Sequence, residues 1–236
     1  MARERFLPGT LVGDRFEIER LAGAGGMGDV YRARDRQRGA AVALKFLRQV
    51  GKGYVTRFER EARALAQLAH PGIVRYVAHG REPAFFLAME WLEGEDLARR
   101  LARGPLSVAQ TLTVARGIAD ALSAAHARGI VHRDIKPSNV FLCGGRLEEV
   151  KLLDFGVAQL DKSTLALTGT GQLIGTLGYM APEQAMSGRD MTPAADVVSH
   201  GCVLFECVAG RGPFAGEWVE VLSKILLSEP PRLREL

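Results

Sequence analysis

One short segment of the chain carries several side chains that could take part in the same reaction. Residues 132–139 read His-Arg-Asp-Ile-Lys-Pro-Ser-Asn, and an Asp-Phe-Gly triplet follows at 154–156. Asp134 could accept or orient the proton of an attacking hydroxyl group, and Lys136 could screen the charge of a phosphoryl group during its transfer. These residue types suit phosphoryl transfer from a metal-bound nucleotide, in which catalysis is mostly positioning and charge neutralisation.

The same segment also offers ligands for a metal ion. Asn139 and Asp154 carry the amide and carboxylate oxygens that Mg²⁺ prefers. A single loop aspartate more often forms a turn or caps a helix. Two linked motifs separated by apolar stretches at 140–142 and 150–153 are hard to explain by turn chemistry alone.

A glycine-rich segment lies upstream, between apolar runs at 16–21 and 30–33. This order predicts a strand, a glycine turn and a second strand, whereas a dinucleotide-binding fold would need a helix after the glycines. Glycine lets the backbone close over phosphates without interference from a side chain. The glycines that could take this role are Gly23, Gly25 and Gly28.

A lysine and a glutamate follow this turn in the order that phosphate binding would need. The β-like run 41–45 ends at Lys45, and a charged segment at 57–68 has apolar residues at helical spacing. Lys45 could instead be an ordinary solvated strand lysine. Glu61 lies beside the apolar stripe, and Glu59 is the competing candidate; both could belong to a solvated face with neighbouring arginines.

These motifs, in this order, resemble the bacterial Hanks-type Ser/Thr protein kinases over about residues 16–236. The resemblance implies that Lys45 holds the α- and β-phosphates of ATP and pairs with Glu61. It also implies Asp134 as the base, with Lys136 beside it, and Asn139 and Asp154 as ligands of Mg²⁺, for which Mn²⁺ could substitute. The cofactors expected are therefore ATP and Mg²⁺.

The apolar run 85–92 resembles the last strand of the small lobe and the hinge of these kinases. The resemblance implies that adenine bonds to backbone at Glu90 and Leu92, with Met89 at the back wall. It further implies that Val30, Ala43 and Phe141 enclose the ring. The full ATP-binding set is then Leu21, Gly23, Gly25, Gly28, Val30, Ala43, Lys45, Met89, Glu90, Leu92 and Phe141.

The fold expected is α+β, a bilobal protein kinase with a small β-rich N-lobe and a larger α-rich C-lobe. We expect a flexible lead-in at 1–15, the N-lobe and hinge at 16–92, and an incomplete C-lobe at 93–236. Helical spacing predicts a helix from Leu106–Ser107 to Arg128, capped at Gly129. The segment that begins at Asp196 resembles the start of the central large-lobe helix of these kinases. In the family, the aspartate at that position braces the backbone of the catalytic loop. Val198 and His200 depart from the family pattern there, where we expect a packing adjustment rather than a change in chemistry.

A long segment rich in Thr, Ser and Gly follows Asp154 and occupies the place of an activation segment. We expect autophosphorylation at Thr168 and Thr170, with the added charge paired by Arg133. The alternative is that these threonines remain unmodified in a flexible loop. Thr176 resembles the substrate-positioning residue of Ser/Thr kinases, and Lys136 also favours a Ser/Thr acceptor.

The sequence stops at Leu236, before the last large-lobe helices of the family, one of which carries the arginine that pairs with Glu183. This predicts a truncated domain with an exposed apolar face and an unpaired Glu183. The leading function is Ser/Thr protein kinase activity. The partners expected are protein substrates and, for autophosphorylation, a second copy of the chain in a transient homodimer. The alternative function is a non-catalytic module that binds nucleotide or a partner.

Composition agrees with a globular chain. The 236 residues are 47% hydrophobic, with a net charge of +4 that is too small to indicate nucleic-acid binding. Three cysteines, Cys143, Cys202 and Cys207, predict no disulfide framework or metal site and favour the cytoplasm. We expect no membrane segment, because no apolar run approaches about 20 residues.

Overall fold

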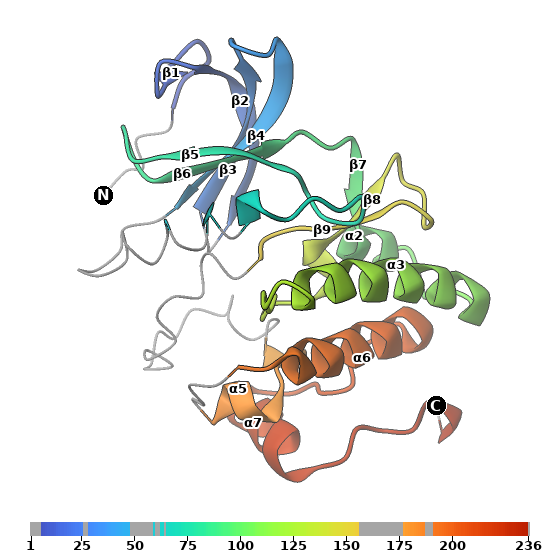
Figure 1. Ribbon diagram of the computed structural model, residues 1–236. Coiled ribbons are helices and arrows are strands. Elements are labelled where there is room, and N and C mark those ends of the chain that lie inside the picture. Colours follow the sequence, from blue (N-terminus) through green and yellow to red (C-terminus); the bar gives the residue numbers. More distant parts are fainter. Residues whose placement is uncertain are drawn as a thin grey trace. The chain divides into compact units, whose positions relative to one another are not determined.

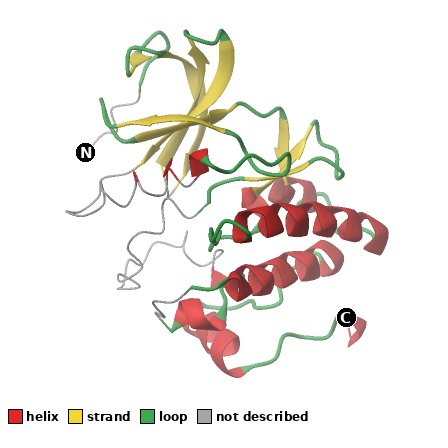
Figure 2. Ribbon diagram, viewed as in Figure 1, coloured by secondary structure: helices red, strands yellow, loops and turns green. Residues whose placement is uncertain are grey.

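The computed structural model describes residues 6–25, 28–47, 59, 62–63, 65–155, 177–186 and 191–235. The chain divides into two units: Met1–Ala69 with Val74–Leu92, and His70–Ile73 with Glu93–Leu236. The described part of the first unit is mainly strand, and that of the second is mainly helix (Figure 2). Predictions at Glu61, Gly156, Thr168, Thr170 and Thr176 lie outside the described residues.

The first unit contains a six-stranded antiparallel sheet with the strand order β1-β2-β3-β4-β6-β5 (Figure 1). Its strands are β1 (Leu11–Val12), β2 (Phe16–Gly25), β3 (Gly28–Asp35), β4 (Ala40–Leu47), β5 (Tyr76–Gly80) and β6 (Phe86–Glu90). The glycine-rich segment joins β2 to β3, with Gly25 opposite Gly28. The two predicted strands on either side of the glycines are therefore confirmed.

Alternation along β3 and β4 separates the two faces of this sheet. Tyr31 and Ala33 on β3, and Val42, Leu44 and Phe46 on β4, are buried on one face. They pack with aromatic residues from β2 and β6 into one apolar core. Residues of the opposite parity, which include Lys45, therefore point to the other face.

The second unit combines a small antiparallel sheet with helices. The sheet has the order β7-β8-β9, built from β7 (Gly94–Asp96), β8 (Val140–Cys143) and β9 (Val150–Leu152). The helices are α2 (Leu97–Leu101), α3 (Val108–His126), α5 (Pro182–Ala185), α6 (Pro193–Ala209) and α7 (Trp218–Leu227), with 3₁₀ turns η1 (Pro137–Asn139) and η3 (Leu233–Glu235).

The helix predicted from Leu106–Ser107 onward is confirmed as α3. Ser107 is its N-cap, and Ser107 and Gln110 form a capping box that satisfies two N–H groups of the first turn. Gly129, the expected cap, has a φ of +69° just beyond the helix end. α3 lies beside α6, as Figure 1 shows in green and orange.

Helix α6 begins near Asp196 as expected. Val198 is 37% exposed, so most of this residue is covered, whereas Val197 is 63% exposed. The Nε2 atom of half-buried His200 is enclosed without a hydrogen-bond partner. Burial lowers the pKa of His200, so the imidazole is held neutral.

Three further observations concern the described part of the chain. Cys143, Cys202 and Cys207 form no disulfide, as expected, and burial raises the pKa of the Cys202 thiol to about 11. Glu183 is half-buried rather than buried, and no ion pair to it occurs among the described residues. None of the described helices combines the length and apolarity needed to cross a bilayer.

Candidate active site

Asp134 lies at the centre of a buried polar cluster in the second unit. The Oδ2 atom of Asp134 is 2.9 Å from Nζ of Lys136 and accepts a hydrogen bond of 3.0 Å from Nδ2 of Asn139. Asn139 Nδ2 also donates to the backbone carbonyl of Asp134 at 2.8 Å. Asp134 is 7% exposed and Asn139 is 4% exposed. The structure therefore brings together three of the residues that the sequence singled out.

Local structure explains how these side chains converge. Lys136 is extended and precedes the 3₁₀ turn η1, whose Pro137 cannot donate a backbone hydrogen bond. Asn139 ends this turn, and β8 begins directly after it. The tight turn reverses the chain, so that Asn139 faces back to Asp134 five residues earlier.

Asp196 braces the backbone of the segment that contains Asp134, as predicted. Its side chain is fully buried and accepts the N–H of His132 at 2.8 Å and the N–H of Arg133 at 2.7 Å. Nε2 of His126, at the end of α3, lies 2.7 Å from the same carboxylate. Arg133 has a φ of +67°, a left-handed conformation that a side chain disfavours. The contacts of Asp196 help to hold that conformation.

His132 links this segment to the residues before the metal-ligand candidate Asp154. The fully buried imidazole donates from Nε2 to the carbonyl of Leu153 at 2.7 Å, and its Nδ1 accepts the N–H of Asp134 at 3.3 Å. Burial lowers the pKa of His132, and the nearby carboxylates Asp196 and Asp134 oppose this only in part. The ring also packs on Phe155, with 4.5 Å between centroids. His132 is therefore a neutral structural link.

The donor set at Asn139 and Asp154 fits a magnesium ion. Both hydrogen-bonding directions of the Asn139 amide nitrogen are used by Asp134, which leaves the amide oxygen Oδ1 as the atom suited to a cation. Asp154 follows β9 with a φ of +55°, and the N–H of Leu153 donates to the Asn139 carbonyl at 2.9 Å. Within the described ranges no three His, Cys, Asp or Glu side chains group closely enough to hold a metal. A site with few protein ligands suits Mg²⁺, which keeps water and phosphate ligands.

The first unit places several predicted ATP-binding residues on one face of its sheet. Val30 on β3 lies directly opposite Lys45 on β4, and Ala43 on β4 lies opposite Met89 on β6. Directly opposed residues share a face, as do alternate residues of one strand. These four side chains therefore share the face away from the aromatic core, and Lys45 is 6% exposed.

The backbone at the glycine-rich segment and at the hinge agrees in part with the predicted contacts to ATP. Gly28 has a φ of +144°, a conformation that other residues avoid, and a Cβ on Gly23 would meet no atom within 4 Å. Glu90 donates its N–H to the carbonyl of Arg75 at 2.9 Å, so of its backbone only the carbonyl suits adenine. The remaining predicted contacts, Leu21, Gly25, Leu92 and Phe141, lie on or beside β2, β6 and β8.

Glu59, the competitor of Glu61, is bound elsewhere within the first unit. Its carboxylate accepts from Nε of Arg81 at 3.0 Å, and Arg81 Nη2 forms an ion pair with it. The arginine lowers the pKa of Glu59 by this hydrogen bond. Glu59 is therefore bound by Arg81, while Glu61, the other candidate, lies outside the described residues.

Sequence reasoning missed two side chains that contact the catalytic loop. The helical spacing of residues 106–128 gives no sign of the bond from His126 to Asp196. The bond of Gln184 to the Arg133 carbonyl joins residues far apart in the chain, so no local pattern predicts it. Only the position of Gln184 directly after Ala-Pro-Glu could have drawn attention to it.

Comparison with known proteins agrees with this geometry. A family model described as protein kinase domain matches residues 16–229. The chain is 38% identical over 233 residues to serine/threonine-protein kinase PknA of Mycobacterium tuberculosis, covering 94% of this chain and 53% of that protein. It is 42% identical over 242 residues to serine/threonine-protein kinase PkaA of Streptomyces coelicolor, covering 94% of this chain and 44% of that protein. The chain thus spans about half the length of the curated relatives it matches.

A solved structure is similar in fold. The crystal structure of the Mycobacterium tuberculosis PknI kinase domain matches with a TM-score of 0.74 and 26% identity, covering 96% of this chain and 92% of that one. The expected fold class, with a β-rich N-lobe and an α-rich C-lobe, is confirmed.

Proposed function

The chain belongs to the protein kinase domain family, and on this premise we propose that it transfers the γ-phosphoryl group of ATP to Ser or Thr hydroxyl groups of proteins. The observation that carries this proposal is the buried cluster in which Lys136 and Asn139 both contact Oδ2 of Asp134. The names of the similar proteins, serine/threonine-protein kinases, support the acceptor class.

Each side chain of the cluster has a role in this reaction. Because Lys136 and Asn139 contact Oδ2, we assign the other oxygen of Asp134, Oδ1, to the acceptor hydroxyl proton. Lys136 would screen charge on the transferred group. The two contacts keep the carboxylate in one rotamer, which favours a fixed approach of the hydroxyl.

We assign residues to the nucleotide and to the metal in turn. When bound, Mg²⁺ or Mn²⁺ neutralises charge on the phosphate oxygens. Asn139 Oδ1 and the Asp154 carboxylate would hold the metal. Lys45, paired with Glu61, would hold the α- and β-phosphates. The remaining proposed ATP contacts are Leu21, Gly23, Gly25, Gly28, Val30, Ala43, Met89, Glu90, Leu92 and Phe141.

The proposal also covers phosphorylation sites, domain bounds and cellular location. Thr168 and Thr170 would be autophosphorylated in a transient homodimer, Arg133 would pair the added charge, and Thr176 would position the substrate. We retain the lead-in at 1–15, the N-lobe and hinge at 16–92 and the C-lobe at 93–236. The three cysteines form no disulfide among the described residues, which together with the use of ATP supports a cytoplasmic location.

The test is the intact mass of the purified chain before and after incubation with Mg·ATP. We expect stepwise addition of phosphate to the wild type and none to Asp154→Asn, which loses a metal ligand. Asp120→Asn is the matched control, because that carboxylate is 76% exposed on α3. It should gain phosphate as the wild type does.

Two other outcomes would contradict the proposal. A wild-type chain that melts cooperatively, gains thermal stability from Mg·ATP and adds no phosphate would be a non-catalytic nucleotide-binding module. If Asp154→Asn gained as much phosphate as the wild type, the assignment of Asp154 as a metal ligand needed for transfer would be wrong. Peptide mapping of the phosphorylated wild type then tests Thr168 and Thr170.

A further inference from the structure

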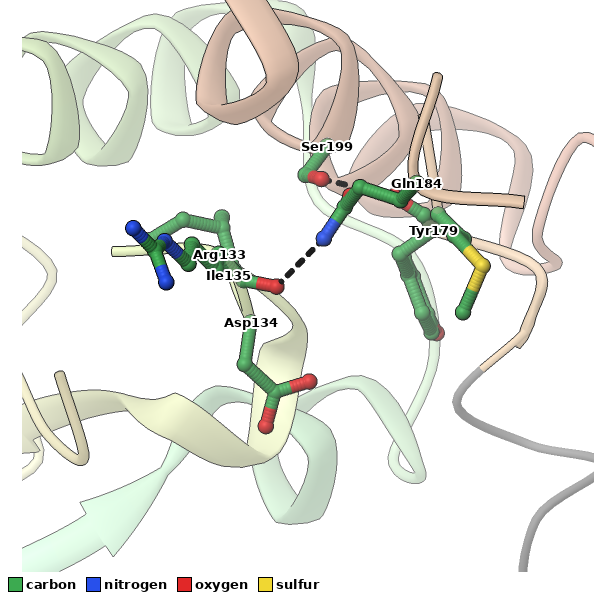
Figure 3. A pocket seen from close by; sticks show the side chains of 7 residues that line it. Arg133, Asp134, Ile135, Tyr179, Gln184 and Ser199 are labelled. Carbon is green, nitrogen blue, oxygen red and sulfur yellow. Dashed lines mark hydrogen bonds between the residues drawn. The ribbon is translucent and has the colours of Figure 1, made fainter. Parts of the chain in front are cut away.

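A glutamine connects the segment at 177–186 to the catalytic loop. Gln184 lies on α5 and is 9% exposed. Its Oε1 accepts the N–H of Ala181 at 3.0 Å, and its Nε2 donates to the carbonyl oxygen of Arg133 at 2.9 Å, the dashed line between the two residues in Figure 3. One neighbour is a donor and the other an acceptor, so a primary amide satisfies both at once. An ionised carboxylate cannot donate to Arg133, and an apolar side chain satisfies neither.

The Arg133 carbonyl belongs to the peptide that joins Arg133 to Asp134. The N–H of Arg133 donates to the Asp196 carboxylate at 2.7 Å, and the N–H of Asp134 donates to Nδ1 of His132 at 3.3 Å. Gln184 holds the carbonyl of that same peptide. With a φ of +67°, Arg133 is in a conformation that needs support from its surroundings. Rotation of this peptide would reorient Asp134, the candidate base.

The segment that carries Gln184 is itself fixed to α6. The Oγ atom of Ser199 donates to the carbonyl of Tyr179 at 2.7 Å, and the Tyr179 hydroxyl donates to Glu206. A small pocket of about 10 Å³ is lined by Gln184, Asp134 and their neighbours. Such a space holds at most about one water molecule.

We propose that Gln184 is a positioning residue for Asp134. It fixes the Arg133–Asp134 peptide through the carbonyl and ties the orientation of the base to the segment at 177–186. The role of Gln184 in turnover rests on the proposed phosphoryl transfer, whereas its hold on the loop does not.

Two substitutions separate the bonds of Gln184. Gln184→Glu keeps the size of the side chain and the acceptor for Ala181, and in its ionised form it loses the donor to Arg133. Gln184→Met has a similar length and removes both bonds. Gln110→Met is the matched control, because Gln110 Oε1 accepts the N–H of Ser107 at 3.0 Å in the same way, but at the exposed start of α3.

Steady-state kinetics with a Ser/Thr peptide should separate positioning from folding. We expect both Gln184 variants to lower kcat about 10- to 100-fold, since a small misplacement of a reacting group has effects of this size. KM for ATP should stay within about twofold of the wild type. Gln110→Met should keep the wild-type kcat. Thermal melts give the folded fraction, and a fall in kcat that only follows this fraction would overturn the inference.

Amide hydrogen exchange gives a readout that does not depend on activity. The amides of residues 133–135 should exchange faster in Gln184→Glu than in the wild type and Gln110→Met, because the peptide is then released on its carbonyl side. Wild-type kcat in Gln184→Glu, or unchanged exchange at these amides, would overturn the proposed role. If the wild type transfers no phosphate, the proposed function fails, while the exchange result still decides whether Gln184 holds the loop.

Discussion

The catalytic loop and the aromatic core of the first unit are both buried, but different interactions hold them. In and around the loop, His132, Asp134, Asn139 and Asp196 are exposed by 7% or less and bond to one another or to backbone. The aromatic core of the first unit is built from apolar and aromatic side chains, and the rings of Tyr31 and Phe46 pack edge to face with 5.6 Å between their centroids.

The difference concerns how strictly each region depends on geometry. Apolar packing tolerates other side chains of similar volume, because dispersion and burial have little directionality. Removal of one partner from a buried hydrogen-bond network costs the most stability, because the remaining polar groups stay buried without a partner. The loop therefore fixes the direction of a few atoms, whereas the core mainly supplies stability.

Asp196→Ala should have the largest effect. It leaves the N–H groups of His132 and Arg133 and the ring of His126 without their common acceptor. We expect unfolding to become easier by about 3–5 kcal/mol, as for removal of one buried polar partner. Phosphate transfer should be lost even at temperatures where the chain is folded. Denaturant unfolding and intact mass after Mg·ATP measure the two effects.

Leu44→Ala in the aromatic core is the comparison for Asp196→Ala. Leu44 is fully buried on β4, and its truncation should cost about 2–5 kcal/mol of stability. The folded molecules should retain their turnover rate. If Leu44→Ala abolished transfer in the folded state, or Asp196→Ala left it intact, the contrast between the two regions would be wrong.

Acid should weaken the loop through His132. Burial lowers the pKa of His132 below its usual 6.5, so the unfolded chain binds a proton there more readily than the folded chain. The stability that neutral His132 contributes to the folded chain is fully present above pH 6.5 and is lost as the pH falls toward the folded-state pKa. The slope from one such group is at most about 1.4 kcal/mol per pH unit. The free energy of unfolding measured between about pH 7 and 5.5 checks this.

His132→Gln removes this titration while keeping a neutral polar side chain, so its stability should fall less steeply with acid. His200 serves as the comparison, because burial lowers its pKa as well but it lies outside the loop network. His200→Gln should flatten the stability profile without changing transfer. Parallel profiles for the wild type and His132→Gln would exclude a contribution of His132.

Glu59→Gln should have the smallest effect. Its partner Arg81 is 55% exposed, and exposed ion pairs contribute little to stability because water and salt screen them. We expect an unchanged melting temperature and unchanged phosphate transfer. Glu61→Gln, in contrast, should lower transfer if Glu61 is the partner of Lys45. Loss of transfer in Glu59→Gln alone would reverse this assignment.

Much of the fold could be predicted from local sequence. Period-two runs gave β2, β3 and β4, the glycines gave the turn between β2 and β3, and helical spacing with Ser107 gave α3. These signals depend on residues that are close in the chain. The environment of Val198 could not be predicted in this way, because periodicity does not reveal how far a helix face is covered; Val198 is 37% exposed in the structure.

The sequence by itself determined which side chains could do the chemistry: a carboxylate, a lysine and an amide within six residues of the loop, with a second carboxylate after β9. Only the tertiary structure decided what holds them. His126, Asp196 and Gln184 reach the loop from α3, α6 and α5, and the bonds of Asp196 and Gln184 to Arg133 span 63 and 51 residues. Such contacts depend on how helices pack in space, and no local pattern of residues encodes a bond between a side chain and a distant backbone carbonyl.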